Sequence, residues 1–452
     1  MEGIYQKSLF SSLATISIDV QTGSRYRILS DSLPWPKIAE VANRHRAKTR
    51  DISNGAPLDL RLHLGILIAQ GMNDLTDRFS EDQVRYHAGV RILCGIADST
   101  KTIDHTSIET FRNSLGKAGV AEINKIIIET ATKHGFTGGR LCSSDTTVQE
   151  SPIAYPTEVG HLKNITEKLV GIGKKVKKGI AEQAENIGKK VKDIFTEIRL
   201  FTNGKKEKVI EKKKELTKKM HRQVVRLKNI VSITIGDMEE KSKAKYQEEL
   251  ELYNLMIEQI RQWIKTGYHP QGKLISLWNQ AARAITRNKL SKKVEMGVRW
   301  FITRLESGYI IGEPCKKIGA DADTKILEEV LPHFVENLNG EVPKIVVYDR
   351  GGDGKKNHDL LEELSVKHNC IFKKGKVKMD VGPQIFKEAK RERALSEASI
   401  ATIKHAKYGF NRPRAKSSES CATKGQMAIL GANLTKFIRD VQISSDMNLE
   451  VI

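Results

Sequence analysis

The chain has 452 residues, and 39% of them are hydrophobic, which is enough for the cores of two or three domains. Its 76 lysine and arginine residues against 55 aspartate and glutamate residues give a formal charge of +21, which indicates an anionic partner: nucleic acid in the simplest case, or alternatively an anionic membrane surface. We expect no membrane insertion, because no apolar run approaches the roughly 20 residues of a span, and no signal peptide, because MEGIYQKSLF lacks a basic segment followed by an apolar one.

The N-terminal part of the chain predicts an all-α domain over residues 1–135. Residues 1–57 are mixed in character, but from Leu58 onward apolar residues recur at the spacing of an amphipathic helix. Thr106 and Glu109 have the spacing of a capping box, which predicts that a helix begins there. Helices are expected over 34–50, 81–94 and 106–134.

A strand is expected next, over residues 138–148, followed by a long polar and helical segment over 160–290. Between Lys163 and Lys228 the chain has 21 basic and 8 acidic residues, a net charge of +13. The sequence IGKKVK occurs twice here with an offset of 15 residues, close to four helical turns, so its two lysine pairs should share one helix face. That face predicts a phosphate-tracking surface, against the alternative of a solvated helix or coiled coil. The four lysines are Lys174, Lys175, Lys189 and Lys190.

Strands and helices alternate in the C-terminal part of the chain. Two strands joined by a turn are expected over 294–305 and 308–314, and KIVVYD, residues 344–349, has the character of a buried strand. A short strand is expected over 370–375, and helices are expected over 323–338, 358–369, 387–406 and 425–441.

This order of elements predicts an α/β domain that is interrupted by a long helical insertion and preceded by an all-α domain. The expected bounds are 1–135 for the N-terminal helical domain, 136–159 and 292–440 for the two parts of the α/β domain, 160–291 for the basic insertion and 441–452 for a tail.

The five cysteines are widely scattered and form no CxxC pair, which argues against a zinc module and against a disulfide framework. We therefore expect a cytoplasmic protein. The sequence GGDGKK, residues 351–356, lacks the spacing and the hydroxyl residue of a Walker motif, so no nucleotide cofactor is expected.

Two aspartates lie where strands are expected to end: Asp145 at the end of the first strand, and Asp349 at the end of KIVVYD. Open α/β sheets bind ligands at this edge, and the helix over 387–406 would bring Glu397 to it. Three converging carboxylates repel one another, and a divalent ion such as Mg²⁺ or Mn²⁺, which prefers hard oxygen ligands, relieves the repulsion. Two such ions can activate water or a 3′-hydroxyl for attack on a phosphodiester. The alternative is that each aspartate is a turn or capping residue.

The helix over 387–406 carries Glu388, Glu392 and Glu397, which compete for one role. At about 100° per residue, the first two point about 180° and 140° away from Glu397. Three basic residues instead lie within about 40° of Glu397, where they would grip DNA beside the metals: Lys390, Arg393 and Lys404. The alternative is a solvated face with an ordinary ion pair.

These motifs resemble those of the DDE transposases of bacterial insertion sequences, over about residues 55–440. SSDTTV and VVYDRGG resemble the two aspartate blocks of that family, and RALSEASIATIK fits its R-x3-E-x6-K signature. The family usually has tyrosine three residues before this arginine, where the chain has Lys390. The stretch from GAPLDLRLHLGILIAQ to DHTSIETFRNSLG resembles the family's N-terminal helical domain, and DTTVQESPIAYPTE before a helical segment resembles one subgroup with an insertion.

The resemblance implies an RNase H-like catalytic domain and a DNA transposase that cleaves element ends and joins them to target DNA. It implies that Asp145, Asp349 and Glu397 are catalytic and hold two Mg²⁺ or Mn²⁺ ions, and that the arginine and lysine of the signature contact DNA. The implied partners are double-stranded DNA, as terminal inverted repeats and as target, and a second copy of the chain in a paired-end dimer. The implied location is the bacterial cytoplasm, on the nucleoid. Two rivals are a metal-dependent nuclease that cuts without joining and a transposase-derived DNA-binding protein with an inactive site.

Overall fold

The structure is a computed structural model, and it describes residues 24–49, 58–96, 100–153, 157–176, 178–200, 207–286, 294–316, 327–337, 340–373 and 379–449. Several expectations concern residues outside these ranges, among them the N-terminal segment MEGIYQKSLF, both ends of the helix over 323–338 and the end of the strand over 370–375.

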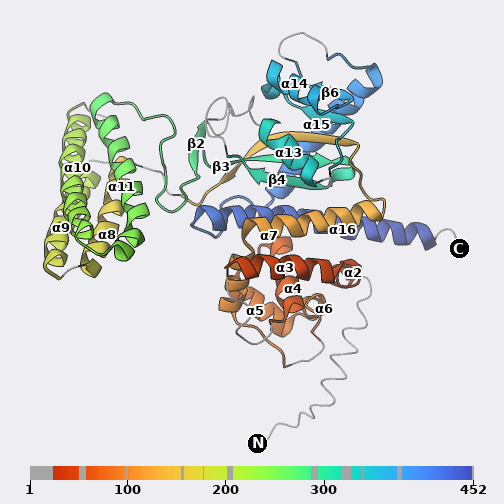
Figure 1. The fold of residues 1–452 in the computed structure, drawn as a ribbon, viewed down its shortest axis with the longest axis horizontal. Helices are drawn as coiled ribbons and strands as arrows, with labels where there is room; N and C mark the ends of the chain where they lie inside the picture. The colour runs from red at the N-terminus through yellow and green to blue at the C-terminus, as the bar shows by residue number, and fades with distance from the viewer. Residues whose placement is uncertain are drawn as a thin grey trace, which may run out of the picture. The chain divides into compact units, whose positions relative to one another are not determined.

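The chain forms two compact units (Figure 1). Unit 1 consists of Met1–Pro152 together with Val298–Ile452, and unit 2 is Ile153–Gly297. Unit 1 is a mixed α/β structure with a mixed sheet, and unit 2 is mainly helical. No helix in the described ranges is both long and apolar enough to cross a bilayer.

Unit 1 begins with helices and continues with the strands of the sheet. Its helices are α2 (Arg25–Ser32), α3 (Trp35–Thr49), α4 (Leu60–Asn73), α5 (Asp77–Tyr86), α6 (Ala88–Leu93), α7 (His105–Lys133), α13 (Leu327–Asn337), α14 (Lys355–Glu363), α15 (Pro383–Ile403) and α16 (Ser418–Leu449). Its strands are β1 (Leu141–Glu150), β3 (Val294–Leu305, which begins in unit 2), β4 (Ile310–Pro314), β5 (Ile345–Tyr348) and β6 (His368–Ile371). Short 3-10 turns are η1 (Glu306–Gly308), η2 (Arg350–Gly352) and η3 (Ala406–Tyr408).

The sheet of unit 1 has the order β3-β1-β5-β6, and β4 also pairs with β3. β3 and β4 are antiparallel and are joined by the expected turn at Ser307 and Gly308, which both have positive φ. β1 is parallel to β5, and β5 is parallel to β6. Parallel neighbours need crossover connections, and α14 lies in the connection between β5 and β6. All four residues of β5 are buried, as expected for a strand that is covered on both faces.

The two faces of this sheet pack against different helices. On one face Cys142, Val346 and Tyr348 join a large buried cluster that includes the N-terminal helices and α16. Figure 1 shows α7 and α16 side by side between the strands and the helices α2 to α6. The other face carries a smaller cluster that involves α15, formed by Leu141, Ile345, Val347, Cys370, Met379 and Ala389. The helix that carries Glu397 is therefore held against the sheet by apolar contacts.

The described residues of unit 2 form four long helices around one buried cluster. They are α8 (Glu158–Val176), α9 (Lys178–Leu200), α10 (Glu207–Gly236) and α11 (Glu240–Thr266). A short strand, β2 (Arg283–Thr286), pairs antiparallel with the first residues of β3. This strand lies inside the segment that was expected to be helical.

The two IGKKVK repeats lie on different helices, so the expectation that their lysines share the face of one helix is wrong. α8 ends at Val176, within the first repeat, the second repeat lies in α9, and each repeat turns its glycine toward the other helix. A Cβ atom on Gly173 would lie 3.1 Å from Cβ of Ala184, and one on Gly188 would lie 2.9 Å from Cγ2 of Val170. The repeat therefore encodes a close packing of α8 on α9, with the lysines left exposed on the outside.

Two other expectations are corrected by the structure. Thr106 does not begin α7, because Asp104 precedes the helix and its side chain accepts a hydrogen bond of 2.8 Å from the N–H group of Thr106. The first strand does not end near Asp145, because β1 continues to Glu150.

Candidate active site

The pairing of β1 with β5 places Asp145 and Asp349 at matching positions on neighbouring strands. Ser143 is in register with Val347, and each aspartate lies two residues further along its chain. Because side chains alternate along strands, Asp145 follows Ser143 on the same face of the sheet. The two carboxylates thus belong to one edge region, although Asp145 lies within its strand rather than at its end.

Local hydrogen bonds fix both aspartates, and both side chains are half-buried. Asp145 accepts a hydrogen bond of 2.6 Å from the N–H group of Thr146. Asp349 directly follows β5 and caps η2, where it accepts a hydrogen bond of 2.9 Å from the N–H group of Gly351. Asp349 therefore has the capping role that is the alternative to metal binding, and its charged side chain lies at the end of β5.

Two contacts bring the middle of α15 to the same region. The Ser396 hydroxyl donates a hydrogen bond of 3.3 Å to the carbonyl oxygen of Ser143, two residues before Asp145. The guanidinium group of Arg393 lies 4.9 Å from the centre of the Phe372 ring. The N–H group of Phe372 in turn bonds to the carbonyl oxygen of Tyr348, the residue before Asp349, at 3.0 Å.

Glu397 follows Ser396 directly and lies one turn after Arg393. Ser396 contacts β1, Arg393 contacts the end of β6, and β5 lies between those strands. Glu397 therefore lies on the same side of α15 as Arg393, whose guanidinium group contacts Phe372 after β6. Its side chain is exposed.

The three glutamates of α15 have different surroundings. Glu392 pairs with Arg304 of β3 at 3.2 Å, and only 14% and 12% of these side chains are exposed. Glu388 pairs with Arg140, which precedes β1. Within the described ranges, no cation or hydrogen-bond donor contacts the carboxylate of Glu397. Two of the three glutamates thus neutralise arginines, and Glu397 is the one left for a ligand.

This difference predicts opposite effects for two conservative replacements. Glu392→Gln should lower the free energy of unfolding by about 3 kcal/mol, because Arg304 loses its charged partner in a mostly buried place, and should keep most of the cleavage activity of the folded protein. Glu397→Gln should change the free energy of unfolding by less than about 0.5 kcal/mol and should eliminate cleavage and strand transfer. Urea unfolding and a DNA cleavage assay on both variants measure the two effects.

Glu388→Gln is the matched control, since its arginine pair is more exposed, and it should keep both stability and cleavage. An inactive Glu392→Gln protein beside an active Glu397→Gln protein would reverse the assignment.

The three basic residues that are expected near Glu397 all belong to α15 or its end, but their surroundings differ. Lys390 is exposed on α15, and Arg393 is half-buried over Phe372. Lys404 is the residue that caps α15 at its end, and it is half-buried. In unit 2 the four lysines of the repeats are all exposed, and one of them, Lys174, pairs with Glu185.

The chemistry of the three site carboxylates fits divalent metal ions, because all their donors are hard oxygen atoms. Their ligand atoms are not gathered within 4.8 Å of one another, as those of a single ion would be.

Another group of possible metal ligands is explained by its structural contacts. In the part of the chain that the structure describes, Glu81, Asp104 and His105 form the group whose ligand atoms lie within 4.8 Å. Asp104 caps α7, and Glu81 accepts hydrogen bonds from the backbone N–H of His105 at 3.2 Å and from its ring nitrogen at 3.1 Å. These bonds hold α5 against the start of α7.

The sequence reasoning missed a second concentration of charge. Basic residues of α7, of the 412–416 segment RPRAK and of α16 line one cavity in unit 1. The RPRAK run was the available signal, but the other contributors lie far from it in the chain.

The N-terminal helices match a known type of domain. A family model described as a transposase domain (DUF772) matches residues 15–114, a stretch that contains α2 to α6 and the start of α7. No curated protein and no solved structure matches the chain significantly. The match supports the interpretation that the protein is a transposase.

Proposed function

We propose that the protein is a DDE transposase, which cleaves the DNA ends of a mobile element and joins them to target DNA. The observation that carries this proposal is the convergence of Asp145, Asp349 and the Glu397 turn of α15 on neighbouring strands, in a chain whose N-terminal region matches a transposase domain. The strand order supports an RNase H-like catalytic domain. Within unit 1 the first aspartate is on the first strand, the second follows the fourth, and the glutamate is on a helix after the last strand.

In this proposal the three carboxylates hold Mg²⁺ or Mn²⁺. The bound ions would supply the charge that activates water or a 3′-hydroxyl and stabilises the leaving oxygen. The protein's own contribution is rigid placement. Asp349 is fixed by its cap on η2, Asp145 by its strand, and Glu397 by the packing of α15 on the sheet. Lys390, Arg393 and Lys404 supply positive charge along the same helix for the phosphates of DNA.

The proposed partner is double-stranded DNA, both as terminal inverted repeats and as target. Paired ends imply two copies of the chain in the active complex. The helices of unit 2 fit the role of a phosphate-binding surface, because their lysines are exposed and outnumber the acidic residues that could neutralise them.

This role of unit 2 predicts a change in salt dependence. Each lost phosphate contact should reduce the slope of log affinity against log salt by roughly 0.9 for duplex DNA. Replacing Lys174, Lys175, Lys189 and Lys190 with glutamine should therefore flatten the slope measured by fluorescence anisotropy. Lys265→Gln in α11, outside the basic segment, is the control and should leave the slope unchanged. A quadruple variant with the wild-type slope would mean that these lysines are only solvated.

The proposed activity is tested by incubating purified protein and Mg²⁺ with DNA that carries the flanks of its own gene and with a target plasmid. Cleavage at the element ends followed by covalent joining to the target is the expected result. Cleavage without joined products would instead identify a nuclease, and binding without either product would identify a DNA-binding protein with an inactive site.

A further inference from the structure

Unit 1 contains a cavity of about 660 Å³ that none of the three site carboxylates lines. It lies between α7, the residue Pro152 after β1, residues 412–417 and the first turns of α16. One acidic side chain, that of Glu109, is among its lining residues. Its basic lining residues are Arg112, Arg412, Arg414, Lys416 and Lys424.

All three arginines have carboxylate partners, and that of Arg412 is Glu150, at 3.4 Å from Nε to Oε2. Arg112 donates a hydrogen bond of 2.9 Å from Nη2 to Oδ2 of Asp77. Arg414 lies 3.7 Å from Asp74, measured from Nη2 to Oδ2, and its Nη1 donates a hydrogen bond of 3.1 Å to the Asp74 carbonyl oxygen. A guanidinium group has five N–H donors, so each arginine keeps donors for a ligand while its carboxylate holds it in position.

Lys424 differs from these arginines. It is half-buried, and in the described part of the chain its ammonium group has no hydrogen bond or ion pair. Burial and the neighbouring charge of Arg112 lower the pKa of Lys424 to about 8, although Asp74 and Asp77 act in the opposite direction. The two nearest carboxylates are already engaged by arginines. The cavity thus contains a cation that is disfavoured by its surroundings until an anion arrives.

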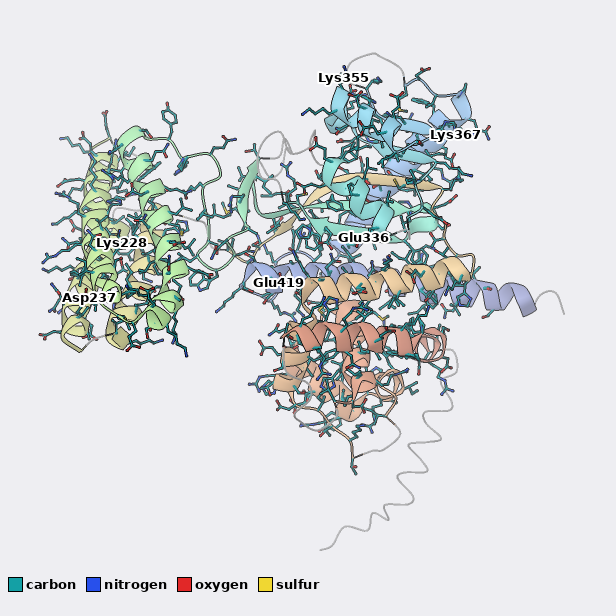
Figure 2. The ribbon with its side chains drawn as sticks, viewed as in Figure 1. Lys228, Asp237, Glu336, Lys355, Lys367 and Glu419 are labelled. Atoms are coloured by element: carbon teal, nitrogen blue, oxygen red, sulfur yellow. The ribbon has the colours of Figure 1, made fainter. Side chains whose placement is uncertain are left out.

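The backbone around the cavity is also unusual. Arg412 has a φ of 48°, which is rarely adopted by a residue with a side chain. Its N–H group bonds to the carbonyl oxygen of Glu150 at 2.7 Å, which ties the segment to the end of β1. The cavity also receives the N-terminal turn of α16, whose position is marked by Glu419 in Figure 2. Glu419 itself accepts a hydrogen bond of 3.1 Å from the N–H group of Lys117 in α7.

We propose that this cavity binds a phosphate of the DNA backbone, at a position distinct from the phosphate that is cleaved. The proposal rests on the proposed function for the identity of the ligand. Basic side chains on three segments and a helix N-terminus converge there, which is the arrangement that binds phosphate in proteins. The volume exceeds that of a lone phosphate and leaves room for the adjoining sugars. The site would hold DNA beyond the carboxyl end of β1.

Lys424→Met is the main test, because methionine keeps the length of the side chain and removes its charge. Its affinity for a duplex, measured by fluorescence anisotropy, should be roughly fivefold or more weaker, and its salt slope should fall by about 0.9. The melting temperature should be unchanged or higher, because a disfavoured charge has been removed. Lys367→Met, an exposed lysine between α14 and β6 (Figure 2), is the control and should match wild type.

The outcomes separate this proposal from the proposed function. Wild-type protein that binds duplex DNA but neither cleaves nor joins it contradicts only the proposed function. Lys424→Met protein with wild-type affinity and slope contradicts only the cavity. A lower melting temperature with an unchanged slope gives Lys424 a purely structural role, which also overturns the proposal.

Inorganic phosphate and pH give two further arms. In the first, the melting temperature is measured in phosphate and in chloride at equal ionic strength. If phosphate raises it for wild type but not for Lys424→Met, while the salt slope of DNA binding is the same for both proteins, the site binds a free anion and the DNA assignment is wrong.

The charged groups that face Lys424 are Arg112, Asp74, Asp77 and Arg414. An anion needs the protonated lysine, so DNA affinity should be full below pH 8 and fall as the pH rises above it, more steeply in wild type than in Lys424→Met. Equal pH profiles would contradict the proposal.

Discussion

Asp349→Asn and Asp145→Asn should each reduce Mg²⁺-dependent DNA cleavage by roughly a thousandfold or more. Metal ions at such sites contribute several kcal/mol to transition-state stabilisation, and each 1.36 kcal/mol corresponds to a factor of ten. Asparagine keeps the shape of the side chain and can still accept the backbone hydrogen bond that caps η2 at Asp349. The fold and the affinity for DNA should therefore stay close to those of wild type.

The matched control for this prediction is Asp353→Asn. Asp353 lies four residues after Asp349 and contacts the ring nitrogen of His358 at 3.0 Å, so its charge serves a structural pair. Its cleavage rate should stay within a few-fold of wild type. Single-turnover cleavage and duplex binding, measured for all three variants, separate a catalytic loss from a binding loss. If Asp349→Asn or Asp145→Asn keeps a tenth or more of the activity, that residue does not belong to the site.

Gly431→Ala should be the most destabilising small substitution in the helices of unit 1. α4 and α16 cross at Gly71 and Gly431, where a Cβ atom on Gly431 would lie 2.0 Å from the carbonyl oxygen of Gly71. The obstacle is the backbone of a helix rather than a flexible side chain, so the two helices must separate. The crossing lies beside the largest buried cluster, and we expect a loss of about 3 kcal/mol or more in the free energy of unfolding.

Gly171→Ala provides the contrast, because Gly171 is also inside a helix, α8, and has nothing within 4 Å of the added Cβ atom. Alanine is favoured over glycine in a helix by about 1 kcal/mol, so this variant should be as stable as wild type or more so. Differential scanning calorimetry of both variants measures the effect. If the Gly431→Ala protein has the melting temperature of wild type, α4 and α16 do not pack as closely as described.

Much of the fold could be predicted from local patterns. The apolar run of β5, the turn at Ser307 and Gly308 and the helix α15 follow from residues close together in the chain. The errors come from interactions that local patterns do not contain. The cap of α7 is Asp104, whose carboxylate accepts a hydrogen bond from the N–H group of Thr106, so Thr106 already lies inside the helix. The repeated lysines would share one face only within a single helix, whereas the glycine of each repeat is a contact between two helices.

The candidate site could be predicted only in part, for the same reason. Helical geometry predicts that Glu397 and Glu392 point in different directions. The arginine that pairs with Glu392, however, comes from β3, 88 residues away in the chain. The position of Asp145 relative to Asp349 depends on the pairing of β1 with β5, which the separate strand patterns did not specify. The basic cavity assembles Arg112 with residues about 300 positions later, and no sequence window contains both.

The chain connectivity around unit 2 has a consequence for folding. β1 and β3 are neighbours in the sheet, yet the helices α8 to α11 and the strand β2 lie between them in the chain. Pairing these strands first would close a very long flexible loop, whose entropic cost grows with the logarithm of its length. The helices α8 to α11 form through short-range contacts, which are fast. Once they have formed, the flexible part of the loop is shorter, and each halving of its length lowers the cost of closure by about 0.6 kcal/mol. The helical unit should therefore fold early, and in doing so it speeds the assembly of the sheet that carries the carboxylates.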